Sequence, residues 1–142
     1  MHKLGPEDLA DLLEQPLVAV LATYRKDGGV LLSPVWHQWR EGGFDVVVYA
    51  KDIKLTHLRR DARASVVVYE HAPPYRGLEV RGQARLSSEG SAEAIAAMAV
   101  RYLGPEDGPL YAATVTDSVL VRLEPEHVRG WDFADDWPAD GD

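Results

Sequence analysis

The nine residues Leu78-Glu-Val-Arg-Gly-Gln-Ala-Arg-Leu86 decide the fold class of this chain, because their character alternates at every step. Apolar residues or glycine occupy every second position, and charged or amide side chains occupy the positions between them. Successive side chains of a β-strand point to opposite faces, so this pattern is typical of a strand with one buried and one hydrated face. The segment therefore predicts an antiparallel sheet.

Apolar runs on either side of this segment predict the other elements. Further strands are expected at Leu17–Tyr24, Val30–Trp39, Phe44–Ala50, Ala64–Glu70, Ser118–Glu124 and His127–Phe133. Helices are expected at Pro6–Glu14, Asp52–Asp61 and Ser91–Leu103, the last ended by Gly104-Pro105. Six to seven strands joined mostly by short turns predict a mainly β fold with flanking helices, an antiparallel barrel. We expect one domain over 1–142, with a frayed acidic tail at 134–142.

Composition and charge exclude several classes of function. The chain has 142 residues and no cysteine, which excludes a disulfide scaffold, a thiolate zinc site and a cysteine nucleophile. Its formal charge of −8 disfavours binding to the phosphates of a nucleic acid. No apolar run approaches the roughly 20 residues that span a bilayer, and the start of the chain does not resemble a signal peptide. We expect a cytoplasmic protein with no membrane or nucleic-acid partner.

Several familiar chemical motifs are missing. The sequence contains no glycine-rich phosphate loop and no Gly-x-Ser-x-Gly turn, and its five histidines show no pair at the spacing of one helical turn. We therefore predict no metal site and no acyl-transfer chemistry.

A basic segment follows the third predicted strand. Five of the fifteen Lys and Arg residues fall between Lys51 and Arg63. Lys54 lies in the first turn of the predicted helix, where free backbone N–H groups and the helix dipole also favour an anion. We expect these cations to converge on a phosphate ester; the alternative is a hydrated basic helix face.

The second predicted strand contains Ser33-Pro-Val-Trp-His37. Pro34 has no N–H, so this strand is expected at an edge or a kink, where free backbone groups can bind a flat heterocycle. Trp36 and Trp39 would face opposite sides of one strand and could not stack together. Each tryptophan is expected either to cap a planar ligand or to fill a core or subunit interface.

Six segments appear in an order that is familiar from one family. They are Val18–Tyr24, Lys26–Gly29, Leu32–Trp36, Lys54–Val66, Leu78–Ala84 and Val128–Phe133. Together they resemble the split β-barrel flavin- and deazaflavin-dependent oxidoreductases, the relatives of pyridoxamine 5′-phosphate oxidase. The resemblance implies an FMN-binding type of split barrel and a homodimer with the cofactor in a cleft between subunits.

The resemblance also implies roles for ten residues. Lys54 matches the phosphate-binding lysine, and His57 and Arg63 lie near the phosphate and ribityl chain. The strand along the ring is matched by Ser33, Pro34, Val35, Trp36 and His37, and the pair beside the cofactor by Val48 and Tyr49.

Two departures bear on the cofactor. Leu32 and Ile53 stand where pyridoxamine phosphate oxidase has arginines on the flavin phosphate, and the C-terminal arginine segment of that enzyme is missing. Vitamin B6 oxidation is therefore disfavoured. The Ser-Pro-Val-Trp and Gly-Trp-Asp-Phe forms resemble the branch that uses the deazaflavin F420, so F420 is favoured and FMN is the alternative.

The resulting hypothesis is an oxidoreductase that passes a hydride between the cofactor and a small organic acceptor. His37 is a candidate proton donor, and Trp36 or Trp131 a candidate for the acceptor side. Two alternatives stay open. One is a non-enzymatic module that binds FMN, haem or a tetrapyrrole, with His37, His57 or His71 as axial ligand of a haem. The other is a structural barrel without a ligand.

Overall fold

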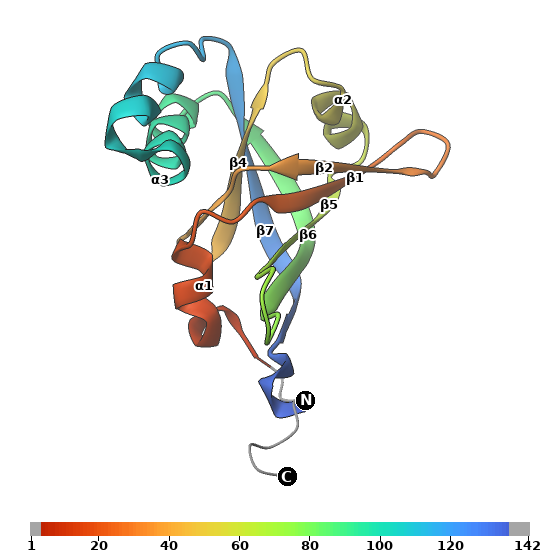
Figure 1. Ribbon diagram of the computed structural model, residues 1–142. Coiled ribbons are helices and arrows are strands. Elements are labelled where there is room, and N and C mark those ends of the chain that lie inside the picture. Colours follow the sequence, from red (N-terminus) through yellow and green to blue (C-terminus); the bar gives the residue numbers. More distant parts are fainter. Residues whose placement is uncertain (1–3, 137–142) are drawn as a thin grey trace.

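Seven antiparallel strands form one sheet in the computed structural model, which describes residues 4–136. They are β1 Ala19–Tyr24, β2 Val30–Val35, β3 Gln38–Arg40, β4 Gly43–Tyr49, β5 Arg63–Tyr69, β6 Gly77–Ser87 and β7 Ser118–Trp131. The strand order is β2-β1-β5-β6-β7-β4-β3, and the sheet curls into a half-barrel (Figure 1). The prediction of a mainly β, six- to seven-stranded antiparallel split barrel is confirmed.

The helices flank this sheet. They are the short 3₁₀ turn η1 Pro6–Leu9, α1 Ala10–Glu14, α2 Ile53–Arg60 and α3 Ser91–Ala112. α2 and α3 lie at one end of the curled sheet, and the described chain ends lie at the other (Figure 1). No helix among residues 4–136 is long and apolar enough to cross a membrane.

Phe133–Asp136 form a second 3₁₀ turn, η2, at the start of the predicted acidic tail. The rest of that tail, 137–142, lies outside the described residues, so its fraying stays a prediction.

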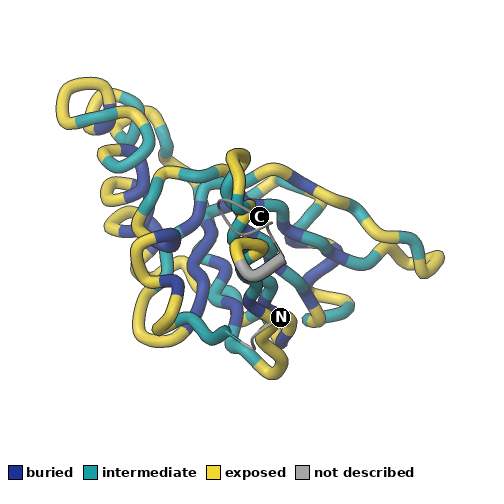
Figure 2. The backbone as a smooth tube through the Cα atoms, turned by 60° about the horizontal axis from the view of Figure 1, so that its bottom comes forward, coloured by how far each residue is buried: buried dark blue, intermediate teal, exposed yellow. Residues whose placement is uncertain are grey.

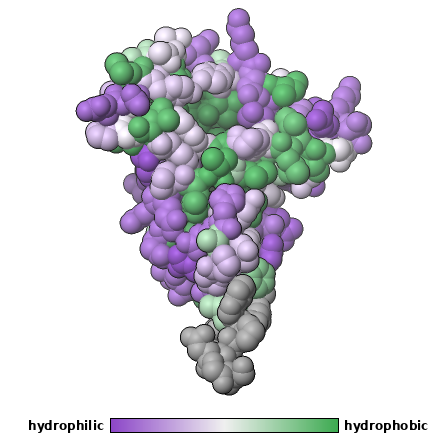
Figure 3. All heavy atoms as spheres, viewed as in Figure 1, coloured by the Kyte–Doolittle hydropathy of each residue, from purple (hydrophilic) through white to green (hydrophobic). Residues whose placement is uncertain are grey.

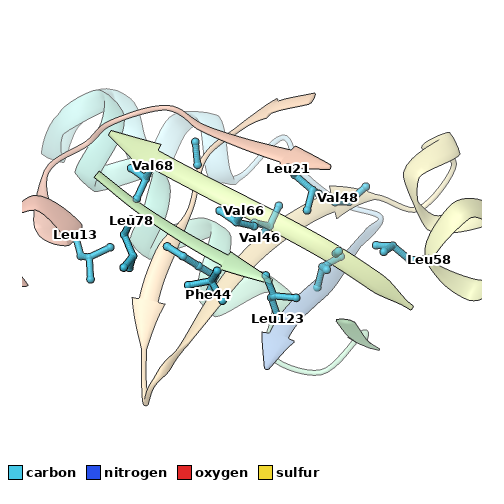
Figure 4. Close-up of a cluster of buried hydrophobic side chains, with 14 of the residues drawn as sticks. Leu13, Leu21, Phe44, Val46, Val48, Leu58, Val66, Val68, Leu78 and Leu123 are labelled. Atoms are coloured by element: carbon cyan, nitrogen blue, oxygen red, sulfur yellow. The ribbon is translucent and has the colours of Figure 1, made fainter. Parts of the chain in front are cut away.

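The core fills the inside of the curl. Alternate side chains of β4, β5, β6 and β7 point inward, and α1 closes one side with Leu12 and Leu13 (Figure 4). β-branched and aromatic residues suit this half-buried pleated surface, which explains why these runs became strands. Burial is concentrated along the strands, whereas the β1–β2 turn and the outer end of α3 are exposed (Figure 2).

The predicted strand Val30–Trp39 is in fact two strands at opposite edges of the sheet. β2 pairs with β1, and β3 pairs with β4. Between them the His37 backbone N–H donates to the Tyr102 hydroxyl of α3 at 3.1 Å instead of joining a strand. The edge position inferred from Pro34 is confirmed, but the continuation to Trp39 is wrong.

The predicted strands Ser118–Glu124 and His127–Phe133 form one continuous strand, β7. Pro125 faces Gly82 across a register shift in β6, where a Cβ on Gly82 would lie 1.9 Å from the Glu124 carbonyl oxygen. Only glycine allows the two backbones to approach this closely, so β7 passes through the proline without ending.

The helix predicted at Ser91–Leu103 breaks at Gly104 as expected, but a second half follows. Gly104 has φ 96° and ψ 171°, a conformation open to glycine, and the helix resumes to Ala112. A Cβ on Gly108 would lie 2.6 Å from the Val100 Cα, so the second half folds back onto the first. This hairpin brings residues from beyond the break to the upper end of the sheet.

Candidate functional site

A pocket of about 240 Å³ lies where β2, β4, α2 and α3 meet. Six of the ten predicted cofactor residues line it: Pro34, Val35, Trp36, Val48, Tyr49 and Lys54. The curl of the sheet brings the end of β2 opposite the end of β4, and α2 begins directly after β4. The end of β2, the β4–α2 segment and α3, which are distant in sequence, therefore share one concave surface.

Lys54 lies in the first turn of α2, as predicted, but its ammonium group already has a counterion. Lys54 Nζ is 2.8 Å from Asp52 Oδ2, and the Lys54 backbone N–H donates to Asp52 Oδ1 at 2.9 Å. Asp52 is thus both the N-cap of α2 and the partner of Lys54. Partial burial alone would raise the pKa of Asp52, but hydrogen bonds from Lys54 outweigh it and lower the pKa. An incoming phosphate competes with Asp52 for this cation.

The opposite end of the pocket is aromatic. The Trp36 ring stacks on Tyr102 at 4.9 Å and 6°, and it meets Tyr111 at 5.2 Å and 59°. The Tyr102 hydroxyl donates to the Leu17 carbonyl at 2.6 Å, which fixes the ring against which Trp36 lies. The Tyr111 and Tyr49 hydroxyls are 2.8 Å apart. This end offers a flat apolar wall with hydroxyl groups at its rim.

The other two candidate tryptophans lie elsewhere. Trp39 belongs to β3 and packs edge-on against Phe44 at the far edge of the sheet. The prediction that Trp36 and Trp39 share one strand is therefore wrong. Trp131 donates from its indole nitrogen to the Tyr75 carbonyl at 2.8 Å and does not line this pocket.

His57 and Arg63 lie outside this pocket. His57 is buried, and its Nδ1 is 3.0 Å from the Thr23 hydroxyl, a contact that holds α2 on β1. The Arg63 guanidinium bonds both carboxylate oxygens of Asp61 and lies over the Tyr24 ring at 4.6 Å. The side-chain hydrogen bond from Arg63 is the main cause that lowers the pKa of Asp61 to about 2. Both contacts have a structural role in the described chain.

The predicted convergence of the basic segment is wrong for the single chain. Lys54 alone of its five cations lines the pocket. Arg60 donates to the Tyr24 carbonyl at 2.6 Å, Arg63 pairs with Asp61, and Lys51 is exposed. Arg60 and Arg63 thus bond to acceptors close to them instead of facing the pocket. The number of charges in the segment could not predict these local bonds.

His37 and Ser33 are buried and do not line the pocket. The His37 ring packs edge-on against Phe44 at 5.4 Å, and neither ring nitrogen has a hydrogen-bond partner among the described residues. Burial, reinforced by the Arg101 charge, lowers the pKa of His37 to about 3. The ring is therefore neutral near pH 7, and its position gives the proton-donor hypothesis no support.

The sequence reasoning missed six lining residues, of which Asp52 and Tyr111 are the polar ones. Asp52 carries a signal that was available, since an aspartate directly before a helix is a preferred N-cap. Tyr111 carries none, because it follows the break at Gly104 and reaches the pocket only through the helical hairpin.

Comparison with known proteins identifies the family. The family model described as pyridoxamine 5′-phosphate oxidase matches residues 6–132. No curated protein matches the chain.

Three solved structures are similar. A conserved hypothetical protein from Mycobacterium tuberculosis is 25% identical, covering 98% of this chain and 92% of its own, with a TM-score of 0.83. An F420 reductase is 28% identical, with 83% and 93% covered and a TM-score of 0.70. A heme storage protein from Vibrio cholerae is 21% identical, with 89% and 94% covered and a TM-score of 0.67, and shows a likeness of fold.

Proposed function

The chain belongs to the pyridoxamine 5′-phosphate oxidase family, and from this premise we propose that it is an oxidoreductase that binds F420 or FMN and transfers a hydride between this cofactor and an organic acceptor. One observation carries the proposal: a single pocket joins the Lys54 ammonium group to the apolar and aromatic wall around Trp36. Phosphate and ring are the two parts of such a cofactor: Lys54 suits the phosphate, and the apolar surface of Val35 and Val48 suits the ring.

The residues present fit this group. Lys54 supplies a charge-assisted donor, and only 15% of its side chain is exposed, so solvent screens the charge incompletely. β2 is an edge strand, so the backbone groups on its outer side are not bonded to another strand in this chain. Those groups suit the N–H and carbonyl edges of an isoalloxazine-type ring. Val35 and Val48 contribute apolar contact area.

The cofactor supplies the hydride chemistry; the protein must orient the ring and exclude water. In this proposal Lys54 neutralises the phosphate, Val35 and Val48 hold the ring plane by apolar contact, and the aromatic wall around Trp36 is left for the acceptor. Holding both the phosphate and the ring of the cofactor restricts the rotation of the bound ring. This restriction favours the orientation in which a hydride can be transferred.

F420 is the favoured cofactor within this proposal. Leu32 and Ile53, which stand in place of two phosphate-binding arginines of the oxidase, are 65% and 56% exposed beside the pocket and offer no charge. The similar F420 reductase is consistent with this preference, and FMN is the second choice.

We also propose that a second copy of the chain completes the site. The pocket of about 240 Å³ is smaller than the roughly 300–1,000 Å³ of sites that bury most of a ligand. Hydrophobic residues gather on the face that contains β2 (Figure 3). Val30 and Leu32 of β2 and Ile53 at the start of α2 are exposed apolar side chains. An exposed apolar patch next to an unpaired edge strand is typical of a subunit interface. A two-fold dimer through this patch would cover both pockets at once.

The non-enzymatic haem alternative needs an axial histidine at this pocket. Of the described histidines, His37 and His57 are buried elsewhere and His71 lies on the loop after β5. None of them lines the pocket. An FMN or F420 carrier without an acceptor remains the second candidate, since the same pocket serves both.

Binding titrations with F420 and with FMN test the cofactor assignment. Lys54→Ala should weaken binding about tenfold or more, because it removes a partly buried charge-assisted bond of roughly 1.5–3 kcal/mol. Lys51→Ala is the matched control, an exposed lysine three positions earlier that does not line the pocket. Equal affinity of the two variants would remove Lys54 from the site. Oxidation of the bound reduced cofactor by an acceptor then distinguishes an enzyme from a carrier.

Sedimentation of Leu32→Glu tests the dimer. A charge at the centre of the apolar patch should give monomers that bind cofactor weakly. Val128→Glu, an exposed apolar position at the separate groove between α1 and β7, should stay dimeric. A wild-type monomer with full cofactor affinity contradicts the shared site.

A further inference from the structure

Two tyrosine hydroxyls meet at the aromatic end of the pocket. Tyr49 is the last residue of β4, and Tyr111 lies in the second half of α3, so the helical hairpin and the strand are joined by their 2.8 Å contact. Both residues line the pocket beside Trp36. Only one hydroxyl can donate along this contact, which leaves the other O–H free to donate to a bound molecule.

The other ionisable groups of the lining are already committed. Among the described lining residues, Asp52 and Lys54 are the remaining ionisable side chains, and they bond each other at 2.8 Å. No described histidine lines the pocket. The tyrosine pair is therefore the remaining source of an acidic hydrogen at this surface.

Tyr111 keeps its proton at neutral pH. Its hydrogen bond with Tyr49 raises the pKa of Tyr111 above the ordinary phenol value, and partial burial acts in the same direction. Asp52 and Lys54 are the charged groups in the lining of the same pocket, and they pair with each other at 2.8 Å.

We propose that the Tyr49–Tyr111 hydroxyl pair donates a hydrogen bond and then a proton to the acceptor, and that the Trp36 wall selects an uncharged, planar acceptor with a carbonyl oxygen. This inference rests on the proposed oxidoreductase function and assigns the acceptor class and the acid of the same site. Apolar aromatic walls favour a flat ring, and an unpaired charge in this end would lose hydration without a counterion.

In the proposed step the acceptor takes a hydride, that is, one hydrogen nucleus with two electrons, from the reduced cofactor. The cofactor is oxidised by this transfer. Negative charge develops on the acceptor oxygen; a tyrosine O–H bond breaks and its proton moves to that oxygen. The tyrosinate then takes a proton from water. A positioned acid of this kind contributes roughly 10²–10⁴-fold to a rate.

The first test needs no cofactor. Nuclear magnetic resonance of ring-labelled tyrosines follows the ionisation of Tyr111 in the wild-type apoprotein and in Tyr49→Phe. The pKa of Tyr111 should fall toward the ordinary phenol value in the variant. An unchanged Tyr111 titration would show that the two hydroxyls do not interact and would overturn the proposal.

The second test measures oxidation of the bound reduced cofactor by naphthoquinone in a stopped-flow instrument. Tyr111→Phe should slow the reaction roughly 10²-fold with unchanged cofactor affinity, and Tyr49→Phe should slow it by a similar factor when measured at saturating cofactor. Tyr75→Phe is the control, because Tyr75 lies on the loop between β5 and β6 and does not line the pocket. If both pocket variants bind the cofactor normally and react at the wild-type rate, the tyrosine inference is overturned, whereas the proposed oxidoreductase function is not. A wild-type protein that binds neither F420 nor FMN removes the proposed function, and this inference falls with it.

The same assay tests the acceptor class. Naphthoquinone sulfonate has the same ring system with a permanent negative charge, and it should react about tenfold more slowly at low concentration, a difference of about 1.4 kcal/mol. Equal or faster reaction of the sulfonate would contradict selection for an uncharged acceptor.

Discussion

Acidification should destabilise this protein through His37, well before its carboxylates titrate. The ring is fully buried against Phe44, and burial together with the nearby Arg101 charge lowers the pKa from 6.5 to about 3. Below about pH 6.5 the unfolded chain binds a proton that the folded ring excludes. Stability is therefore complete above that pH and is lost progressively as the pH falls toward 3.

The size of the loss follows from these two pKa values. Each pH unit within the window costs about 1.4 kcal/mol, so the free energy of unfolding should fall by about 2 kcal/mol between about pH 7 and about pH 5. Carboxylates, whose ordinary pKa values lie near 4, contribute mainly at more acid pH.

Urea unfolding of the wild type and of His37→Phe at these two pH values measures the effect. The aromatic variant cannot titrate, so it should lose about 2 kcal/mol less than the wild type over this interval. His37→Leu repeats the test with a smaller side chain, and His71→Phe, on an exposed loop, is the control. A pH dependence in both His37 variants as steep as that of the wild type would refute the assignment.

Three further results are expected. Asp52→Asn keeps a helix N-cap but removes the counterion of Lys54, so phosphate-bearing cofactors should bind several-fold more tightly, about 1 kcal/mol, in the same titrations; weaker binding would show that Asp52 instead orients the lysine. Asp45→Ala leaves Arg40 and Arg122 without their buried partner and should lower the free energy of unfolding by about 3 kcal/mol in urea. Gly82→Ala places a methyl group against a backbone carbonyl and should lower the melting temperature by several degrees, and an unchanged melt would contradict the close approach of β6 and β7.

Much of the fold was predictable because its signals are local. Alternation in Leu78–Leu86 placed β6, the apolar run Phe44–Ala50 placed β4, and the polar segment Asp52–Asp61 placed α2 within a residue at each end. Pro34 correctly indicated an edge strand. Each of these features depends on side chains within a few positions of one another.

The errors arose where distant partners decide the outcome. Val30–Trp39 contains an unbroken strand-like pattern. In the structure, however, the His37 backbone N–H donates to the Tyr102 hydroxyl, and the residues after it form β3 at the other edge of the sheet. The basic segment has the charge of an anion site. In the structure, however, Arg63 forms an ion pair with Asp61, and Arg60 donates to the Tyr24 carbonyl.

The amino-acid sequence by itself determined β4, β6, α2 and the position of a lysine at the start of α2, because backbone preference and burial period act over short distances. Only the tertiary structure decided which cation faces the pocket and that two tyrosines sixty-two positions apart meet at its rim. Those contacts depend on how the sheet curls and how α3 folds back at Gly104, and packing across the whole molecule sets both.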